Sequence, residues 1–264
     1  MRTAYLGPAG SWTHQAALEL FGEAGLVPLA QDELFAAYVA GTVDQVCVPV
    51  ITSIVGLTPY MGAVLDLPAV TVVAEYPRML GYSLLARPGA RLEDIAQVFG
   101  HPVALEETKP WLDRVMPRAR RTEAASGGAA AAAVAGSPMA DKASVGPRIG
   151  ASIYDLVSLV DGIEEGPHNV TRWWVLGREM PAPSGRDKTS LLTSVADKDL
   201  AGLLASFGDA GVQVLTIYER PSRKSLDTHR YLIEVVGHAS ESRLMRLLDR
   251  RSDVRVMGSY PRAY

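Results

Sequence analysis

The sequence predicts an α/β protein: a long region of alternating strands and helices, followed by a small ferredoxin-like domain. Three observations support this prediction. Short apolar runs that end in glycine alternate with amphipathic segments along most of the chain. The segment Met180–Arg186, Met-Pro-Ala-Pro-Ser-Gly-Arg, has the composition of a linker. The residues beyond it follow a β-α-β-β-α-β pattern, which is the ferredoxin-like order.

Bulk composition limits the classes of protein to consider. The chain has 264 residues, 48% of them apolar and 21% charged, which suits one large or two modest globular domains. A net charge of −3 gives no reason to expect nucleic acid as a partner. The single cysteine, Cys47, excludes an internal disulfide or a cysteine-based metal site and is most simply a buried strand residue. Without an apolar leader or membrane-length run, we expect a soluble cytoplasmic protein.

The N-terminal element is a strand, Ala4–Leu6, which ends at the turn Gly7-Pro8-Ala9-Gly10. Ser11 or Thr13 then caps an amphipathic helix that runs to Leu20. A strand, a glycine turn, a polar cap and a helix in this order direct free backbone N–H groups toward an anion. The same order recurs where the apolar run Gln45–Val50 leads into Thr52-Ser53-Ile54-Val55-Gly56.

The elements that follow continue the alternation. Further strands are expected at Ala69–Ala74, Gly81–Ala86, Val98–Gly100 and Met139–Val145. Helices are expected at Leu92–Ile95, at Pro102–Met116 with a bend or break at Pro110, and at Ala124–Ala135, entered through Ser126-Gly127-Gly128. Parallel βαβ units bind ligands outside the carboxyl ends of their strands, so the site should lie there.

The last region supplies the ferredoxin-like pattern. Its strands are expected at Thr189–Val195, Val212–Tyr218, His229–Val236 and Val254–Met257, and its helices at Leu200–Gly208 and Glu241–Asp249. A segment of this length can fold as an independent domain.

Several motifs, taken in order along the chain, resemble those of the prephenate dehydratase family. In the first region they are Gly7–Ala17, Val48-Pro49-Val50, His101-Pro102 and Asn169-Val170-Thr171-Arg172-Trp173, which is similar to the Thr-Arg-Phe motif of the family. In the second region Asp187–Ser190, Arg220-Pro221-Ser222 and Gly258–Arg262 resemble the attached ACT regulatory domain. The ordered set spans nearly the whole chain.

The resemblance implies a fold and an activity. The family converts prephenate to phenylpyruvate in phenylalanine biosynthesis, with loss of carbon dioxide and water, and uses no metal or organic cofactor. It implies a periplasmic-binding-protein-like catalytic region at 1–180, with lobes at about 1–75 with 166–180, and at 76–165. It further implies an ACT domain at 187–264, a possible amino-acid effector, and a homodimer or homotetramer paired through the ACT domains.

Thr171 is the expected catalytic residue, because the matching threonine of the family assists departure of the ring hydroxyl. The alternative for Thr171 is a helix cap or an ordinary strand residue. Arg172 could grip a substrate carboxylate, although a surface or interlobe salt bridge is nearly as plausible for it. The other expected substrate contacts lie at helix starts and are Ser11, Thr52, Ser53, Ser126 and Gly127. Ser11 and Ser53 could equally be plain helix caps.

Other polar and aromatic residues have simpler interpretations. His101 is expected to be a histidine at the end of a strand, and Trp173 and Trp174 to pack in the core. The cluster Arg118, Arg120 and Arg121 is expected to be a solvated face.

Two stretches depart from the family pattern at the site. Ile51-Thr52-Ser53-Ile54-Val55-Gly56 stands where Glu-Asn-Ser-x-Glu-Gly is usual, so two carboxylates and an amide are missing. Ser126-Gly127-Gly128 replaces Ser-Thr-Ala. A site that loses buried polar partners changes its substrate or rate, which suggests a specialised relative.

The regulatory domain departs as well, around Lys198–Leu203 and at Tyr218-Glu219-Arg220-Pro221. We therefore predict weak or absent inhibition by phenylalanine. The effector contacts implied by the resemblance are Leu200, Leu203, Glu219, Arg220 and Pro221.

Three functions follow from these observations. A prephenate dehydratase is favoured because Thr171 and the ACT pattern are both kept. A prephenate decarboxylase or an analogue-specific lyase of a natural-product pathway is the first alternative. The second alternative is an inactive ligand-binding sensor, which the altered Ile51–Gly56 stretch would allow.

Overall fold

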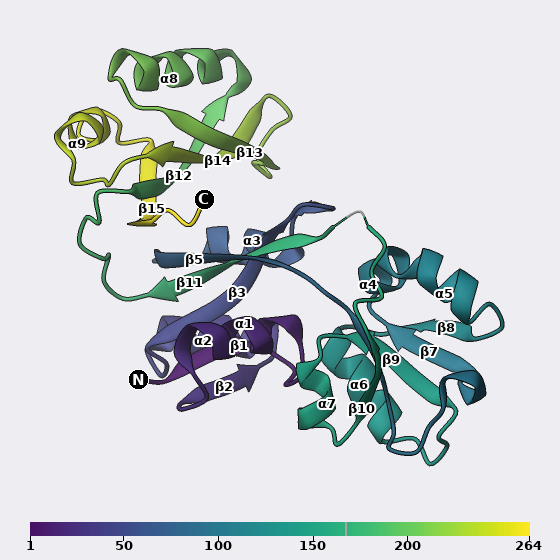
Figure 1. Ribbon diagram of the computed structural model, residues 1–264. Coiled ribbons are helices and arrows are strands. Elements are labelled where there is room, and N and C mark those ends of the chain that lie inside the picture. The colour runs from purple at the N-terminus through teal and green to yellow at the C-terminus, as the bar shows by residue number, and fades with distance from the viewer. Residues whose placement is uncertain (167) are drawn as a thin grey trace. The chain divides into compact units, whose positions relative to one another are not determined.

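The computed structural model describes residues 1–166 and 168–264, and it has the mixed α/β class that the sequence predicts (Figure 1). It contains three sheets. The chain forms two compact units, the first made of Met1–Tyr60 and Pro77–Trp173, the second of Met61–Tyr76 and Trp174–Tyr264. The segment 61–76 and the residues after Trp173 thus group with the C-terminal region. Of the helices in the described ranges, none has the length and apolar character required to cross a bilayer.

The first sheet has strand order β2-β1-β3-β11-β5, with β4 paired to β3. Its strands are β1 (Thr3–Leu6), β2 (Leu26–Leu29), β3 (Gln45–Thr52), β4 (Gly56–Leu57), β5 (Thr71–Met79) and β11 (Val170–Gly177). The helices between them are α1 (Trp12–Phe21), α2 (Gln31–Ala40) and α3 (Pro59–Asp66). β1 pairs in parallel with both β2 and β3, as the predicted βαβ units require. Cys47 is fully buried in β3, which confirms its expected place.

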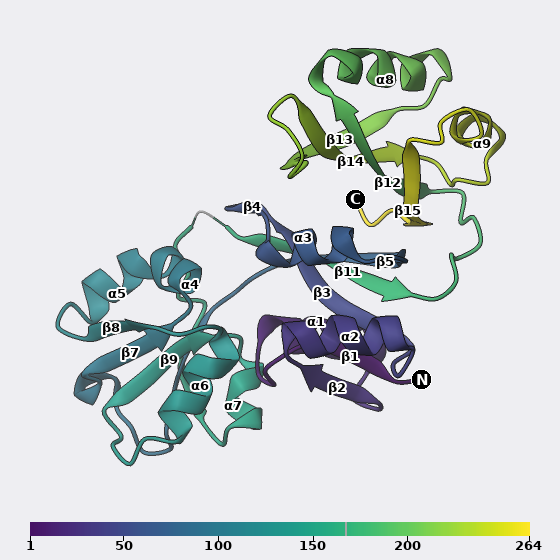
Figure 2. The ribbon, with the colours of Figure 1, turned by 180° about the vertical axis from the view of Figure 1, so that it is seen from behind.

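The second sheet has strand order β10-β6-β9-β7-β8. Its strands are β6 (Ser83–Ala86), β7 (Gln97–Gly100), β8 (Arg120–Glu123), β9 (Lys142–Gly146) and β10 (Val157–Asp161). Its helices are η1 (Leu92–Asp94), α4 (Pro102–Glu107), α5 (Lys109–Val115), α6 (Gly127–Ala135) and α7 (Ile149–Ile153). Figures 1 and 2 show α4 and α5 on one face of this sheet and α6 and α7 on the other, which buries strands on both sides.

One prediction for the second sheet needs correction, and a second holds only in part. The expected helix Pro102–Met116 is two helices that meet at Thr108, and Pro110 lies in the first turn of α5, where its missing N–H has no helical partner to lose. Arg120 and Arg121 belong to the edge strand β8; Arg118 and Arg120 are exposed, as expected of a solvated face, whereas Arg121 is only partly exposed. Arg121 forms an ion pair with Asp113, and its side chain is only 26% exposed.

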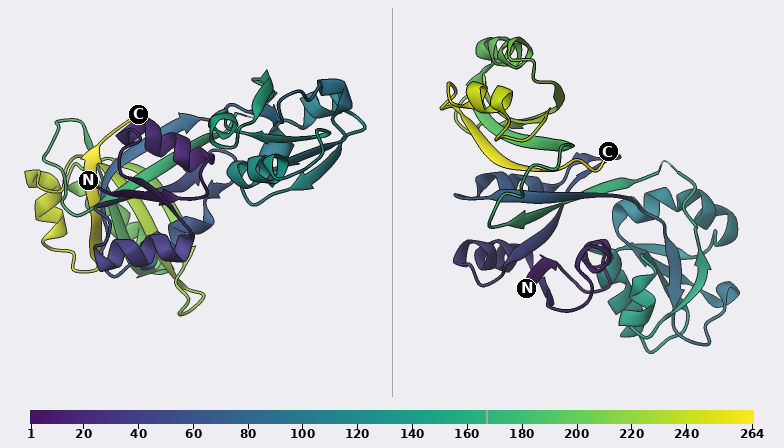
Figure 3. Two further views of the ribbon diagram at one scale, coloured as in Figure 1. Left: turned by 90° about the horizontal axis from the view of Figure 1, so that it is seen from below. Right: turned by 60° about the vertical axis from the view of Figure 1, so that its left-hand side comes forward.

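The third sheet contains β12 (Asp187–Ala196), β13 (Val214–Pro221), β14 (Thr228–Val236) and β15 (Val254–Pro261). With α8 (Asp197–Asp209) and α9 (Ser242–Leu248), they follow the predicted βαββαβ order in an antiparallel sheet β13-β14-β12-β15. Both helices lie on one face of this sheet (Figures 1 and 3). That face forms an apolar core of Leu191, Leu203, Phe207, Ile233 and Leu244 with their neighbours.

Charged groups join the third sheet to α3 and β5 within the second unit. Lys188 Nζ lies 2.7 Å from a carboxylate oxygen of Glu75 and 3.6 Å from one of Glu234, and all three side chains are at most 2% exposed. Arg255 donates to the carbonyl oxygen of Leu65 at 3.1 Å, at the C-terminal end of α3, where the helix dipole favours a cation. The second unit is therefore held together by polar contacts as well as by its apolar core.

Candidate active site

A cavity of about 510 Å³ in the first unit is lined largely by the beginnings of helices. Residues at the starts of α1, α2, α3 and α6 all reach its wall, namely Ser11, Trp12, Thr13, Ala30, Gln31, Thr58, Pro59, Tyr60, Ser126 and Gly127. The N-terminal end of a helix carries a partial positive charge and unpaired N–H groups. No lysine or arginine is among the described residues of this wall. The cavity is therefore suited to an anionic ligand through helix ends rather than through charged side chains.

Ser11 and Ser126 cap two of these helices. Ser11 Oγ accepts a hydrogen bond from the N–H of His14 at 3.2 Å, and Ser126 Oγ accepts one from the N–H of Ala129 at 3.1 Å. Each is thus the N-cap that the sequence allows and also a residue of the cavity wall. The expected contacts Thr52 and Gly127 lie in the wall as well.

Thr171 lies in β11 and is 4% exposed. Its Oγ1 donates to Asn169 Oδ1 at 3.5 Å, and both residues belong to the cavity wall. Trp173, two residues further on, also reaches the wall, and its Nε1 donates to Thr13 Oγ1 at 3.1 Å. Because side chains alternate along a strand, Asn169, Thr171 and Trp173 share one side of the backbone.

The structure separates two of the expected contacts from the cavity. Of the described residues, neither Arg172 nor Ser53 belongs to the wall. Arg172 is 3% exposed and follows Thr171 in the strand, so its side chain leaves the opposite face. Ser53 Oγ accepts from the N–H of Val170 at 2.8 Å and donates to the carbonyl of His168 at 3.1 Å. Ser53 thus fixes the end of β3 to the start of β11.

A buried carboxyl group that nothing in the local sequence marks as functional lies beside Asn169 and Tyr82, two residues of the cavity wall. Glu107, the last residue of α4, is 2% exposed. Its Oε1 accepts from Asn169 Nδ2 at 2.9 Å and from the Tyr82 hydroxyl at 3.3 Å. The pKa of Glu107 is raised to about 7, mainly by burial; the hydrogen bonds from Asn169 and Tyr82 lower it, and the carboxylate of Glu164 raises it.

Two further titratable groups reach the cavity. Tyr82 is 2% exposed, and burial raises its pKa well above the usual phenol value. His101 caps α4 through Nδ1, which accepts from the N–H of Val103 at 3.3 Å, and burial lowers the pKa of its imidazole. Both are ordinary residue types, and only the fold brings them to the wall.

Glycines let two helix beginnings come together at the cavity. A β-carbon on Gly128 would lie 2.5 Å from the carbonyl oxygen of Ala9, and one on Gly127 would lie 2.8 Å from Pro147 Cδ. The two glycines that stand in place of the Thr-Ala of the usual Ser-Thr-Ala step are therefore required by packing in this chain. The Tyr154 hydroxyl donates to the same Ala9 carbonyl at 2.8 Å, which fixes the turn before α1.

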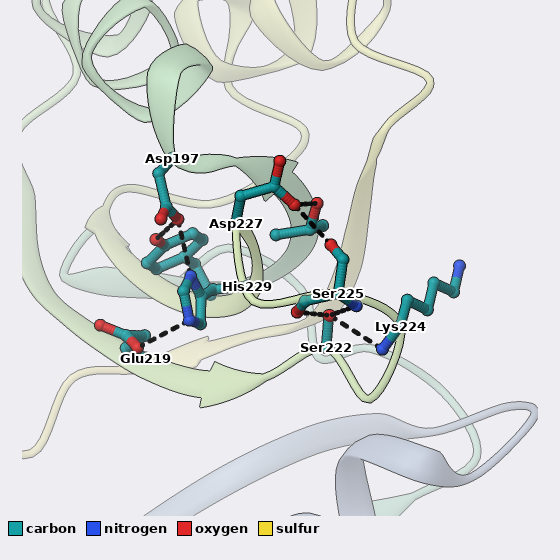
Figure 4. A network of polar contacts seen from close by, with 9 residues as sticks. Asp197, Glu219, Ser222, Lys224, Ser225, Asp227 and His229 are labelled. Atoms are coloured by element: carbon teal, nitrogen blue, oxygen red, sulfur yellow. Dashed lines mark hydrogen bonds and ion pairs between the residues drawn. The ribbon is translucent and has the colours of Figure 1, made fainter.

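The expected effector contacts lie in the C-terminal domain, and most have identifiable local roles. Leu203 is 1% exposed in the apolar core, with Leu200 packed against that core, and Pro221 is the exposed last residue of β13. His229 Nδ1 lies 2.6 Å from Asp197 Oδ1, and its Nε2 lies 3.4 Å from Glu219 Oε1 (Figure 4). The two contacts of His229 join the start of α8 to β13 and β14. Arg220 lies against α3, since its Nη2 would be 2.8 Å from a β-carbon on Gly62.

A second, more open depression of about 840 Å³ is lined by residues that include Gln15, Arg78, Arg148 and Glu164. It contains none of the residues expected at the site from the sequence. The 510 Å³ cavity, which gathers Ser11, Thr52, Ser126, Gly127 and Thr171, is the candidate active site.

Comparisons with solved structures agree with this fold. The chain superposes over its whole length on GqqA, described as a novel type of quorum quenching acylase, with a TM-score of 0.90 at 22% identity, which shows a shared fold. It also superposes on the prephenate dehydratase of Arthrobacter aurescens, solved in complex with L-Phe. That match has a TM-score of 0.88 and 27% identity and covers 100% of this chain and 90% of the other.

Sequence relatives identify the family. The bifunctional chorismate mutase/prephenate dehydratase of Neisseria gonorrhoeae is 34% identical over 271 residues, covering 98% of this chain and 74% of that protein. The prephenate dehydratase of Mycobacterium tuberculosis is 32% identical and covers 99% of this chain and 87% of its own length. The family model for prephenate dehydratase matches residues 3–181. The chain therefore belongs to the prephenate dehydratase family.

Proposed function

We propose that the 510 Å³ cavity converts prephenate to phenylpyruvate, with the Thr171 hydroxyl directed at the ring hydroxyl that departs. Membership of the family makes the chain a carbon–oxygen lyase. The observation that carries the site assignment is the buried Thr171 side chain in a cavity formed by helix beginnings. No cofactor is needed in this account, because formation of the aromatic ring provides the driving force.

The charges of the substrate fit this wall. Prephenate carries two carboxylates, and the beginnings of α1, α2, α3 and α6 present partial positive charge to them. Arg172 contributes to this proposal only as a buried structural group, because its side chain leaves the other face of β11. Holding the ring between fixed walls accounts for much of the rate enhancement, since orientation alone is a large effect.

Mixing the purified chain with prephenate and following phenylpyruvate in alkali tests the activity. Formation of phenylpyruvate supports dehydration. A non-aromatic decarboxylated product would show that the chain is a decarboxylase instead. Saturable binding of prephenate without any turnover would show that it is a ligand-binding sensor.

The C-terminal βαββαβ domain is proposed to be an ACT domain that responds weakly, if at all, to phenylalanine. The Arthrobacter aurescens relative was solved with L-Phe, which makes phenylalanine the effector to test. In this chain Asp197 immediately precedes the first divergent stretch, Glu219 belongs to the second, and His229 bridges the two carboxylates (Figure 4). A compact charged network is a poor surface for the apolar ring of phenylalanine. Calorimetry should detect no micromolar binding, and a micromolar isotherm would refute this part of the proposal.

A further inference from the structure

The reaction proposed above consumes a proton, and the structure offers a source for it. When prephenate loses carbon dioxide, the electron pair of the broken carbon–carbon bond enters the ring and the bond to the ring hydroxyl breaks. The dianion becomes a monoanion, carbon dioxide and water only if one proton joins the departing hydroxide. An acid that can be reprotonated in each turnover is therefore required.

Thr171 alone cannot meet this requirement. Its hydroxyl donates to Asn169 Oδ1, an amide oxygen that carries no proton to return. If Thr171 gave its proton to the departing oxygen, it would remain an alkoxide with no donor behind it. A hydroxyl in this position orients and polarises the departing group rather than acting as the net acid.

Glu107 and Tyr82 form a pair with the required geometry. Glu107 is outside the cavity wall, but its Oε1 lies 3.3 Å from the hydroxyl of Tyr82, which is in the wall. Asn169 Nδ2 holds the same oxygen at 2.9 Å. Glu107 Oε2 is buried and has no hydrogen-bond partner among residues 1–166 and 168–264. A buried carboxyl group with one unsatisfied oxygen favours the protonated form.

We propose, resting on the proposed function, that Glu107 supplies the proton for the departing hydroxyl and that Tyr82 passes it into the cavity. With Glu107 protonated on Oε1, the 3.3 Å contact reverses: Oε1–H donates to Tyr82 Oη, and the phenol O–H turns to donate to the departing oxygen. The carboxyl proton then moves to Tyr82 Oη as the phenol proton moves to the departing oxygen. Water leaves, and Glu107 remains as a carboxylate held by Asn169 Nδ2. A proton from solvent restores it before the next turnover.

The other charged and titratable groups agree with this assignment. Burial keeps the pKa of Glu107 near 7, and the facing carboxylate of Glu164 acts in the same direction. The Tyr82 backbone N–H, at 2.7 Å, holds Glu164 in place. Among the described residues, no cation contributes to the pKa of Glu107, where it would favour the ionised form. His101 has its pKa lowered by burial and is mostly neutral at pH 7, so it is the weaker acid candidate.

The pH profile of turnover tests the proposal. Wild-type kcat should fall above about pH 7 as Glu107 loses its proton. Glu107→Gln keeps an oxygen acceptor for Asn169 but has no acidic proton, so kcat should drop about 100-fold with little change in KM. The decline on the basic side should disappear as well. Tyr82→Phe should show a similar loss, and the double variant should be no slower than either, because both act in one relay.

Controls separate this relay from a structural role. Glu106 precedes Glu107 in α4 and is exposed, so Glu106→Gln should leave the pH dependence of kcat unchanged. His101→Asn should keep the decline on the basic side. If Glu107→Gln retained near-wild-type kcat, or if His101→Asn alone removed that decline, the relay would be refuted.

Infrared difference spectra separate failure of the relay from failure of the proposed function. Wild type minus Glu107→Gln should show the carbonyl band of a protonated carboxylic acid at pH 6 that fades as the pH passes about 7. If prephenate were not turned over at all, the proposed function would fail, and this band would still decide whether Glu107 holds a proton. Absence of the band at pH 6 overturns the inference in either case.

Discussion

The backbone of Gly128 passes so close to Ala9 that a β-carbon on Gly128 would lie 2.5 Å from the Ala9 carbonyl oxygen. This approach brings the turn before α1 against the first residues of α6, and both elements line the cavity. The two helix beginnings are therefore held by a contact that only glycine permits.

We expect Gly128→Ala to destabilise the protein by about 1–3 kcal/mol and to lower kcat/KM, because the clash involves backbone atoms that cannot rotate away. Gly136→Ala, at the C-terminal end of the same helix, is the matched control. The nearest atom to its β-carbon is the Ala132 carbonyl oxygen at 3.4 Å, and its φ of −74° suits alanine. Chemical denaturation of both variants checks the prediction, and equal stabilities would contradict it.

The buried ion pair between Lys188 and Glu75 predicts a large effect on stability. Lys188→Met leaves two buried carboxylates, those of Glu75 and Glu234, without this cation. Removing one partner of such a group costs about 3–5 kcal/mol. Lys198→Met, at an exposed position of α8, should change stability by less than about 0.5 kcal/mol. Urea unfolding measures both, and a small loss for Lys188→Met would show that the carboxylates tolerate its removal.

His229 makes the stability of the C-terminal domain depend on pH. The hydrogen bond to Asp197 raises the pKa of His229, and the charges of Asp197, Glu219 and Asp227 add to this. A raised pKa stabilises the fold at low pH, and the benefit is lost as pH rises through the folded-state pKa, above the usual value of about 6.5. His229→Gln should therefore show a smaller decline in Tm across neutral pH than wild type, with His168→Gln as the control. Parallel pH curves for wild type and His229→Gln would contradict the assignment.

Glu107 also has a raised pKa, so it too should make the folded protein less stable as the pH rises. Its pKa is about 7 in the folded chain, against about 4.3 for an ordinary glutamate. Wild type should therefore lose about 1–3 kcal/mol of stability relative to Glu107→Gln between pH 5 and pH 8. Denaturation at the two pH values measures this difference. A constant difference would mean that Glu107 titrates normally and is not an acid at neutral pH.

Local signals predicted the caps and most of the elements. Ser11 was recognisable because a serine between a glycine-rich turn and a helical segment has one strongly favoured role, Ser126 was recognisable only as part of the entry to a helix, and the βαββαβ order followed from apolar alternation. The helix α2 was missed, because an alanine caps it and its face pattern is weak. Local propensity alone could not identify it.

The buried acid could not be predicted, because its neighbours are distant in sequence. Glu107 is separated from Tyr82 by 25 positions and from Asn169 by 62. Only the tertiary fold brings the last residue of α4 beside Tyr82 and Asn169, and nothing near Glu107 in the sequence marks it as buried. The orientation of the Arg172 side chain could have been predicted, because neighbouring side chains of a strand point to opposite faces and Arg172 follows Thr171 in β11.

Single-turnover rates with prephenate measure the proposed action of the Thr171 hydroxyl on the departing group. Thr171→Val keeps the shape of the side chain without the hydroxyl, so phenylpyruvate formation should slow by roughly 100-fold or more while prephenate binding persists. Thr171→Ser should stay within about tenfold of wild type. A Thr171→Val variant that forms phenylpyruvate at the wild-type rate would contradict the claim.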